Sequence, residues 1–139
     1  MRILAVDPGS KRLGIAISDE TGTIANPLKV ILHVSRIIDA ALVVDLSVSN
    51  RVGLILVGQS LDENGLPTYE GRRAQRFAEA LKLQTGIPVL LWDEAFTTQA
   101  ARSARLDLGV ARRKRAGHLD DLAATALLQD YLDTTSGRG

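Results

Sequence analysis

The sequence predicts a single α/β domain, residues 1–139, built on a five-stranded mixed sheet with three antiparallel strands, then two parallel strands, and flanking helices. Three short apolar runs separated by turn residues open the chain, and two wholly apolar runs later alternate with helix-like segments. Strand-helix-strand connections favour parallel pairing and place helices on the faces of a sheet. A length of 139 residues suits one domain with a sizeable core.

The composition is that of an ordinary folded chain, with 45% hydrophobic and 24% charged residues. Cysteine is absent, so disulfides and thiolate metal sites are excluded, and any metal must bind oxygen or imidazole ligands. The chain begins with a strand-like segment instead of a leader, and no apolar run approaches the roughly 20 residues that cross a bilayer. We therefore expect a cytoplasmic protein with no membrane partner.

The antiparallel part of the sheet comes first. The apolar run Arg2–Asp7 ends in Asp-Pro-Gly, and a second run, Leu13–Ser18, ends before another polar turn. The third predicted strand, Thr23–Leu32, contains Pro27, which has no N–H to donate to a neighbouring strand. We therefore expect this third strand to be frayed or to lie at an edge.

Helices and buried strands alternate after the third strand. The spacing in Val34–Asn50 favours a helix with Ser35 as its N-cap. The apolar run Gly53–Gly58 is typical of a strand buried on both faces. The polar segment Gln59–Tyr69 is predicted to be a functional or mobile loop. An apolar stripe opposite a row of arginines then predicts a helix over Glu70–Gly86.

The remaining elements complete the domain. Val89–Trp92 is the next predicted buried strand, and Thr97–Leu108 is predicted to be helical. Gly109–His118 reads as a basic loop, and Leu119–Asp133 as a final helix with an alanine-rich face. Thr134–Gly139 is expected to be a flexible tail.

Basic residues gather in three clusters although the net charge is only +1. Such clusters can bind the phosphates of a nucleic acid, and the alternative interpretation is an ordinary solvated surface. The candidate nucleic-acid-binding residues are Lys11, Arg12, Arg72, Arg73, Arg76, Arg112, Arg113, Lys114 and Arg115.

Acidic residues stand at the carboxyl ends of predicted strands, where α/β sheets bind ligands. Asp7 ends the first strand, and Asp93 and Glu94 follow the fifth. Each acid alone could form a turn, and Asp120 could cap the last helix. Several carboxylates brought together would repel one another unless cations neutralised them. Two divalent ions can activate a water and stabilise the leaving oxygen of a displacement at phosphorus, which is nuclease chemistry.

Four segments resemble the YqgF (RuvX-like) family, which is described both as Holliday-junction resolvases and as pre-16S rRNA nucleases and has a ribonuclease H-like fold. ILAVDPGSKRLGIAISD resembles the family's opening hairpin, and LILVG with the following DENG loop resembles its fourth strand. WDEAFTT is similar to the acidic end of the fifth strand, and HLDDLAATALLQDYLD to the final helix. The segments lie in order along nearly the whole chain.

The resemblance implies that Asp7, Glu94 and Asp120 are catalytic and bind a divalent metal, Mg²⁺ or Mn²⁺. Patterning alone leaves Asp93 and Asp121 as alternatives, and the match to the family favours Glu94 and Asp120 over them.

The chain also departs from the family pattern. Ala95 stands where the family usually has arginine after the glutamate, and Gln59 and Ser60 replace a Leu-Pro pair. Asp62 stands in place of the usual asparagine in the following loop, where it could add an acid to the site or occupy a turn.

The function that the resemblance implies is that of a metal-dependent nuclease in 5′-end maturation of pre-16S rRNA, acting on structured RNA. One alternative is a resolvase of four-way DNA junctions that uses the same carboxylates, and another is a non-catalytic RNA-binding assembly factor. The opening hairpin also begins actin-like kinases and ATPases, but those proteins need a second lobe for which this chain is too short. A homodimer stays an open alternative.

Overall fold

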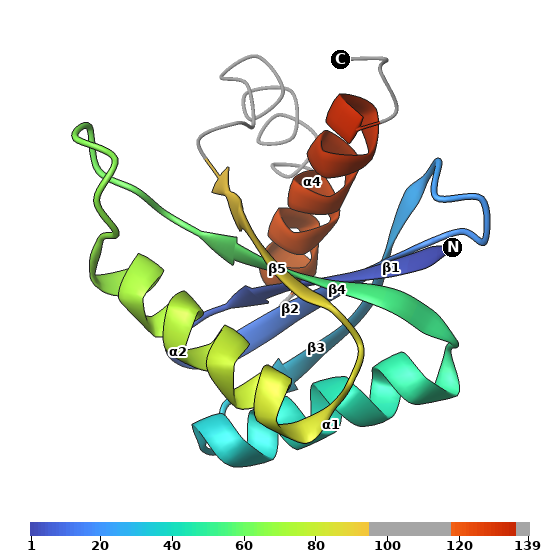
Figure 1. The fold of residues 1–139 in the computed structure, drawn as a ribbon, viewed down its shortest axis with the longest axis horizontal. Coiled ribbons are helices and arrows are strands. Elements are labelled where there is room, and N and C mark those ends of the chain that lie inside the picture. The colour runs from blue at the N-terminus through green and yellow to red at the C-terminus, as the bar shows by residue number, and fades with distance from the viewer. Residues whose placement is uncertain (95–117, 136–139) are drawn as a thin grey trace.

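The computed structural model describes residues 1–94 and 118–135. In the second of these segments, the side chains are described for residues 122–135 only. In the described part of the chain, five strands form one sheet in the order β3-β2-β1-β4-β5, and three helices pack around it (Figure 1). The strands are β1 (Arg2–Pro8), β2 (Arg12–Ser18), β3 (Ala25–Leu32), β4 (Val52–Gln59) and β5 (Val89–Asp93). The helices are α1 (Arg36–Ser49), α2 (Tyr69–Gln84) and α4 (His118–Thr135).

The pairing of the strands confirms the predicted mixed sheet. β1 pairs antiparallel with β2, and β2 pairs antiparallel with β3. β1 also pairs with β4, and β4 with β5, both in parallel. Because β1, β4 and β5 run in the same direction, their carboxyl ends meet at one edge of the sheet.

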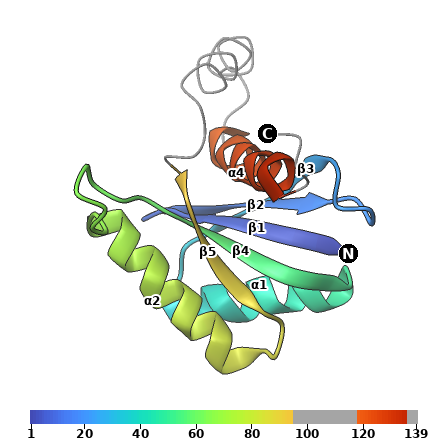
Figure 2. The same ribbon diagram turned by 45° about the horizontal axis from the view of Figure 1, so that its top comes forward.

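The two faces of the sheet are covered by different helices. Figure 2 shows α1 and α2 on one face and α4 on the other. Successive residues of a strand point to opposite faces, and accordingly Leu4 and Val6 pack among the residues of α1 and α2. Ile3 and Ala5 pack instead against α4. The sheet therefore separates two apolar clusters, and odd-numbered residues of β1 face α4.

The edge position predicted for the proline-bearing strand is confirmed. β3 is the outermost strand on its side of the sheet. Pro27 lies opposite Ala16, whereas Lys29 lies opposite Ile15, so the register shifts by one residue beside the proline. A proline without an N–H is tolerated there because an outer strand needs hydrogen bonds on one side only.

The expectation of a buried fifth strand is wrong. In β4 the central residues Ile55, Leu56 and Val57 have no exposed surface, as predicted. β5 is the last strand of the sheet, and its residue Leu90 is 41% exposed. Since β5 pairs with β4 alone among the described residues, it lacks the second neighbour that completes burial.

Helix ends follow their capping residues. The Ser35 side chain accepts a hydrogen bond from the N–H of Ile38, which confirms it as the N-cap of α1. α4 ends at Thr135, where the hydroxyl donates to the carbonyl of Tyr131 over 2.8 Å. The predicted tail therefore begins two residues too early. The predicted helix Thr97–Leu108 and residues 109–117 of the predicted basic loop lie outside the described residues, whereas His118, the last residue of that loop, begins α4.

Candidate active site

Asp7 lies near the carboxyl end of β1 and faces α4. It is the sixth residue of the strand, pairs with Gly14 of β2 and is half-buried. Ile3 and Ala5 pack against α4, so the two-residue period of the strand directs the Asp7 side chain to the same face. Val6 pairs with Val57, so the next residue of β4, Gly58, lies beside Asp7. Asp7 therefore stands at the predicted edge of the sheet.

The side chain of Glu94 reaches the α4 face beside Gly58. A Cβ atom added to Gly58 would lie 3.2 Å from Glu94 Oε1, so this carboxylate lies over the glycine. Trp92, two residues earlier, also packs on the α4 side, whereas Leu91 packs on the opposite side. The same alternation turns Asp93 toward α1 and α2. Of the two adjacent acids, Glu94 shares a face with Asp7.

Gly58 leaves room for this carboxylate. The added Cβ would also lie 2.7 Å from Leu127 Cδ2, closer than real Cβ atoms approach a neighbour. A side chain at residue 58 would therefore occupy the space between β1, β5 and α4. Sequence reasoning noticed Gly58 only as the end of an apolar run and assigned it no role. Its place between β1 and β5 becomes visible only when the strand order is known.

The third predicted carboxylate belongs to the helix that covers this face. Asp120 and Asp121 lie in the first turn of α4, and their side chains are outside the described part of the structure. Leu127, which borders the space at Gly58, lies seven residues after Asp120, or about 10 Å along a helix axis. α4 contacts β1, β2 and β3 on the face to which Asp7 points.

The chemistry of the described residues fits a divalent cation. Asp7 and Glu94 supply carboxylate oxygens on one face, the ligands that Mg²⁺ and Mn²⁺ prefer. The missing Cβ of Gly58 lets the Glu94 carboxylate and Leu127 approach β4 closely. Among described residues, no group of three or more histidine, aspartate or glutamate side chains could hold a metal. A third ligand must therefore come from elsewhere in the chain, from the substrate or from water.

One basic cluster lies at the turn that follows Asp7, and a second lies on α2, which contacts that turn through Arg73. Lys11 and Arg12 are exposed at that turn, and Arg72 and Arg76 are exposed on α2. Arg73 is not part of the solvated row that we expected. It is half-buried, and its Nη2 donates to the carbonyl of Gly9 over 3.2 Å.

The third basic cluster, which consists of Arg112, Arg113, Lys114 and Arg115, lies outside the described residues. Asp62, by contrast, is well placed and acts as a turn residue. Its Oδ1 accepts hydrogen bonds from the N–H groups of Asn64 and Leu66 over 2.8 and 2.9 Å, at an exposed loop tip.

Known proteins of similar sequence are nucleases by name. The chain is 38% identical over 139 residues to a protein of Thermoanaerobacter pseudethanolicus named "Putative pre-16S rRNA nuclease", a match that covers 99% of this chain and 100% of the relative. A protein of the same name from Syntrophus aciditrophicus is 39% identical over 136 residues, covering 98% and 91% of the two chains.

Within the described residues, no helix is long and apolar enough to cross a membrane.

Solved structures with the same fold are junction resolvases. Thermus thermophilus RuvC in complex with a Holliday junction substrate has a TM-score of 0.64 and 20% identity, covering 99% of this chain and 97% of RuvC. The fowlpox virus Holliday junction resolvase has a TM-score of 0.59 and 16% identity, covering 97% and 99%. At these identities the likeness establishes the fold, which is the ribonuclease H-like fold that the sequence predicted.

A match to a family model covers most of the sequence. Residues 1–134 match the model of the RuvX family, which is described as a Holliday junction resolvase. Together with the identity to curated relatives over nearly the full length, this match shows that the chain belongs to the RuvX family of nucleases.

Proposed function

We propose that this protein is a metal-dependent nuclease that hydrolyses phosphodiester bonds in pre-16S rRNA during maturation of its 5′ end. The observation that carries the proposal is the position of the Glu94 carboxylate over Gly58, on the same face as Asp7. Two acids from separate strands thus border a space that no side chain of β4 fills. The names of the curated relatives support the RNA substrate. A ribosomal RNA precursor implies a cytoplasmic site of action.

Asp7, Glu94 and Asp120 would hold the divalent ions. When bound, such ions supply an activated water and stabilise the leaving oxygen of the displacement at phosphorus. The chain's own contribution is positioning. Asp7 is fixed within the sheet and Glu94 at the end of β5, so neither carboxylate depends on a long loop. Leu127 is 2% exposed and closes one side of the space with an apolar wall.

Basic residues beside the site would bind the substrate strand. Lys11 and Arg12 are exposed at the turn after Asp7, where they can neutralise phosphates near the scissile bond. Contacts of this kind contribute affinity and orientation rather than recognition of a base sequence. We therefore expect the shape of the RNA, more than its sequence, to decide where the strand binds.

Single substitutions of the acids test the proposal. Asp7→Asn and Glu94→Gln should each abolish Mg²⁺-dependent cleavage of a pre-16S rRNA fragment while RNA binding stays near that of the wild type. Asp93→Asn is the matched control, because its side chain faces the other side of the sheet and its loss should leave cleavage within about twofold. Full metal-dependent activity in Asp7→Asn would refute the role of Asp7 in metal binding. If Asp93→Asn loses activity while Glu94→Gln keeps it, Asp93 and not Glu94 would be the metal ligand.

Two competing functions make different predictions in the same assay. The description of the family model as a Holliday junction resolvase favours a four-way DNA junction as the second candidate substrate. Cleavage of the DNA junction but not of the RNA, under identical metal conditions, would select that alternative. A non-catalytic assembly factor would bind RNA and cut neither substrate. The departures at Gln59, Ser60 and Ala95 are compatible with lost activity, whereas retention of all three acids speaks against it.

A further inference from the structure

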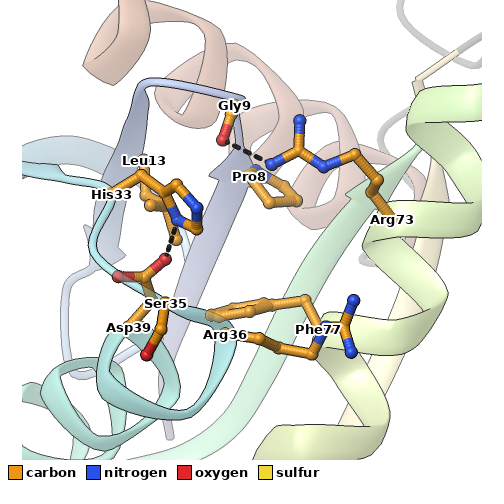
Figure 3. A pocket seen from close by; sticks show the side chains of 9 residues that line it. All are labelled: Pro8, Gly9, Leu13, His33, Ser35, Arg36, Asp39, Arg73 and Phe77. Atoms are coloured by element: carbon orange, nitrogen blue, oxygen red, sulfur yellow. Dashed lines mark hydrogen bonds and ion pairs between the residues drawn. The ribbon is translucent and has the colours of Figure 1, made fainter.

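A polar pocket lies on the face of the sheet opposite the carboxylates. It has a volume of about 220 Å³ and is enclosed by the β1–β2 turn, the start of α1 and one side of α2 (Figure 3). Pro8 lines it, as expected, because the residue after Asp7 points to the opposite face. His33, Arg36 and Arg73 line this pocket from three different segments, and the Arg36 side chain runs beside Phe77.

The charges in the pocket are unbalanced. Neither Arg36 nor Arg73 has a carboxylate partner among the described residues. Asp39 is the only acid among the described residues that line the pocket, and it is 2% exposed. Its Oδ2 lies 2.5 Å from His33 Nδ1, and its Oδ1 accepts from the N–H of Val34 over 3.0 Å. Asp39 is thus occupied in orienting His33, and the Nε2 side of that ring remains for a ligand.

Two residues of the pocket also fix the turn that follows Asp7 through hydrogen bonds. Arg73 Nη2 donates to the carbonyl of Gly9, and the N–H of His33 donates to the carbonyl of Lys11 over 2.9 Å. The turn itself is closed by the N–H of Gly9, which donates to the carbonyl of Arg12 over 2.9 Å. A Cβ at Gly9 would lie 2.4 Å from that carbonyl oxygen, so the tight turn requires glycine. The pocket is therefore built from the same backbone that leads away from Asp7.

We propose that this pocket binds a phosphate group of the nucleic-acid strand, separately from the phosphate that is cleaved. This inference rests on the proposed nuclease function. Two guanidinium groups can form paired hydrogen bonds with phosphate oxygens, and an imidazole N–H can add another. The volume is below the roughly 300–1,000 Å³ of pockets that hold whole small molecules, so it suits a phosphate better than a nucleotide. His33 and Arg36 are exposed, so a strand passing over the turn can reach them.

Binding measurements without cleavage test this site. The affinity of the full chain for a labelled single-stranded RNA is measured in EDTA at several salt concentrations, for the wild type, Arg36→Gln and Arg73→Gln. The matched control is Lys82→Gln, which removes one positive charge from an exposed residue of α2 outside the pocket. We expect Arg36→Gln and Arg73→Gln each to weaken binding roughly tenfold and to reduce the salt slope by about one, relative to Lys82→Gln. Melting curves verify that each variant is folded.

Three results would overturn the proposal. The first is binding by both arginine variants that equals binding by Lys82→Gln. The second is weaker binding by Arg73→Gln alone, because Arg73 would then act only by holding the turn at Gly9. The third comes from inorganic phosphate. If millimolar phosphate shifts the NMR signals of His33 while all variants bind RNA equally, the pocket takes a free anion and not the strand.

The two proposals fail in distinguishable ways. If the pocket binds no phosphate of the strand, cleavage would still require the metal ion and Asp7. Absence of cleavage by the wild-type protein would refute the nuclease proposal, whereas the binding data in EDTA would still report on Arg36 and Arg73.

Discussion

Gly58→Ala tests how closely the candidate active site is packed. The new Cβ would lie 2.7 Å from Leu127 Cδ2 and 3.2 Å from Glu94 Oε1. Leu127 is 2% exposed and has little space into which to move, so the first contact strains the apolar cluster under α4. Inserting a methyl group into such a core typically lowers the free energy of unfolding by about 1–3 kcal/mol.

The second contact acts on the carboxylate. At 3.2 Å the oxygen must withdraw by a few tenths of an ångström, which approaches the roughly 0.5 Å tolerance of a catalytic group. A displacement of about 1 Å can reduce a rate about 100-fold, so we expect cleavage by Gly58→Ala to be slower by about 10-fold to 100-fold. Urea unfolding measures the stability, and single-turnover cleavage at saturating Mg²⁺ measures the rate.

Two further variants separate stability from positioning. Gly86→Ala is the matched control, because a Cβ there has no neighbour within 4 Å and should leave stability and rate nearly unchanged. Leu127→Val shortens the side chain that meets the new methyl group, so the double variant Gly58→Ala/Leu127→Val should be less strained but still slow. Wild-type stability and wild-type rate in Gly58→Ala would refute the inferred crowding. Full rescue of the rate by Leu127→Val would show that Glu94 is not displaced.

Two other predictions concern the stability of the fold. Hydrogen bonds from the Thr21 hydroxyl first, and then from the backbone N–H groups of Ile24 and Thr23, hold the pKa of Asp19 well below its usual value. Their stabilisation is complete above the unfolded-state pKa of about 3.9 and is lost as the pH falls below it, so the urea midpoint of Asp19→Asn should fall less between pH 6 and pH 3 than that of the wild type. An equal fall in both proteins would contradict this. Asp39→Ala should lower the free energy of unfolding by about 3 kcal/mol or more, because it leaves the N–H of Val34 and the His33 ring without their acceptor. Urea unfolding measures this change, and a loss no larger than that caused by Asp45→Ala, an exposed acid of the same helix, would refute it.

Much of the fold was predictable because it depends on local patterns. The apolar runs and their turns define the strands, and Pro27 marks an outer strand through its missing N–H. The exposure of β5 was not predictable in this way. Its sequence is as apolar as that of a central strand, and only the absence of a second described partner for it leaves Leu90 in solvent.

In the candidate site too, features that depend on local spacing were predictable, whereas a feature that depends on a distant residue was not. The choice of Glu94 over Asp93 could have been made by counting alternate residues from the half-buried Trp92, without knowledge of a family. Arg73 lies four residues before Phe77, so helical spacing already placed it on the packed side of α2. The role of Gly58 could not be read in this way. It depends on Leu127, which is distant in the sequence and becomes a neighbour only when α4 folds onto the sheet.

The covering of the sheet by α4 implies an order of assembly during synthesis. β1 and β2 are made first, yet Ile3 and Ala16 are buried against Leu128 and other residues of α4, which emerge from the ribosome more than a hundred residues later. Long-range contacts of this kind form slowly, and nascent domains complete their packing only when the last element is available. The other cluster, with α1 and α2, can form earlier. A nascent chain that has already folded one of its two apolar clusters therefore still lacks the helix that covers the other face, so the candidate site is completed only after translation has passed α4.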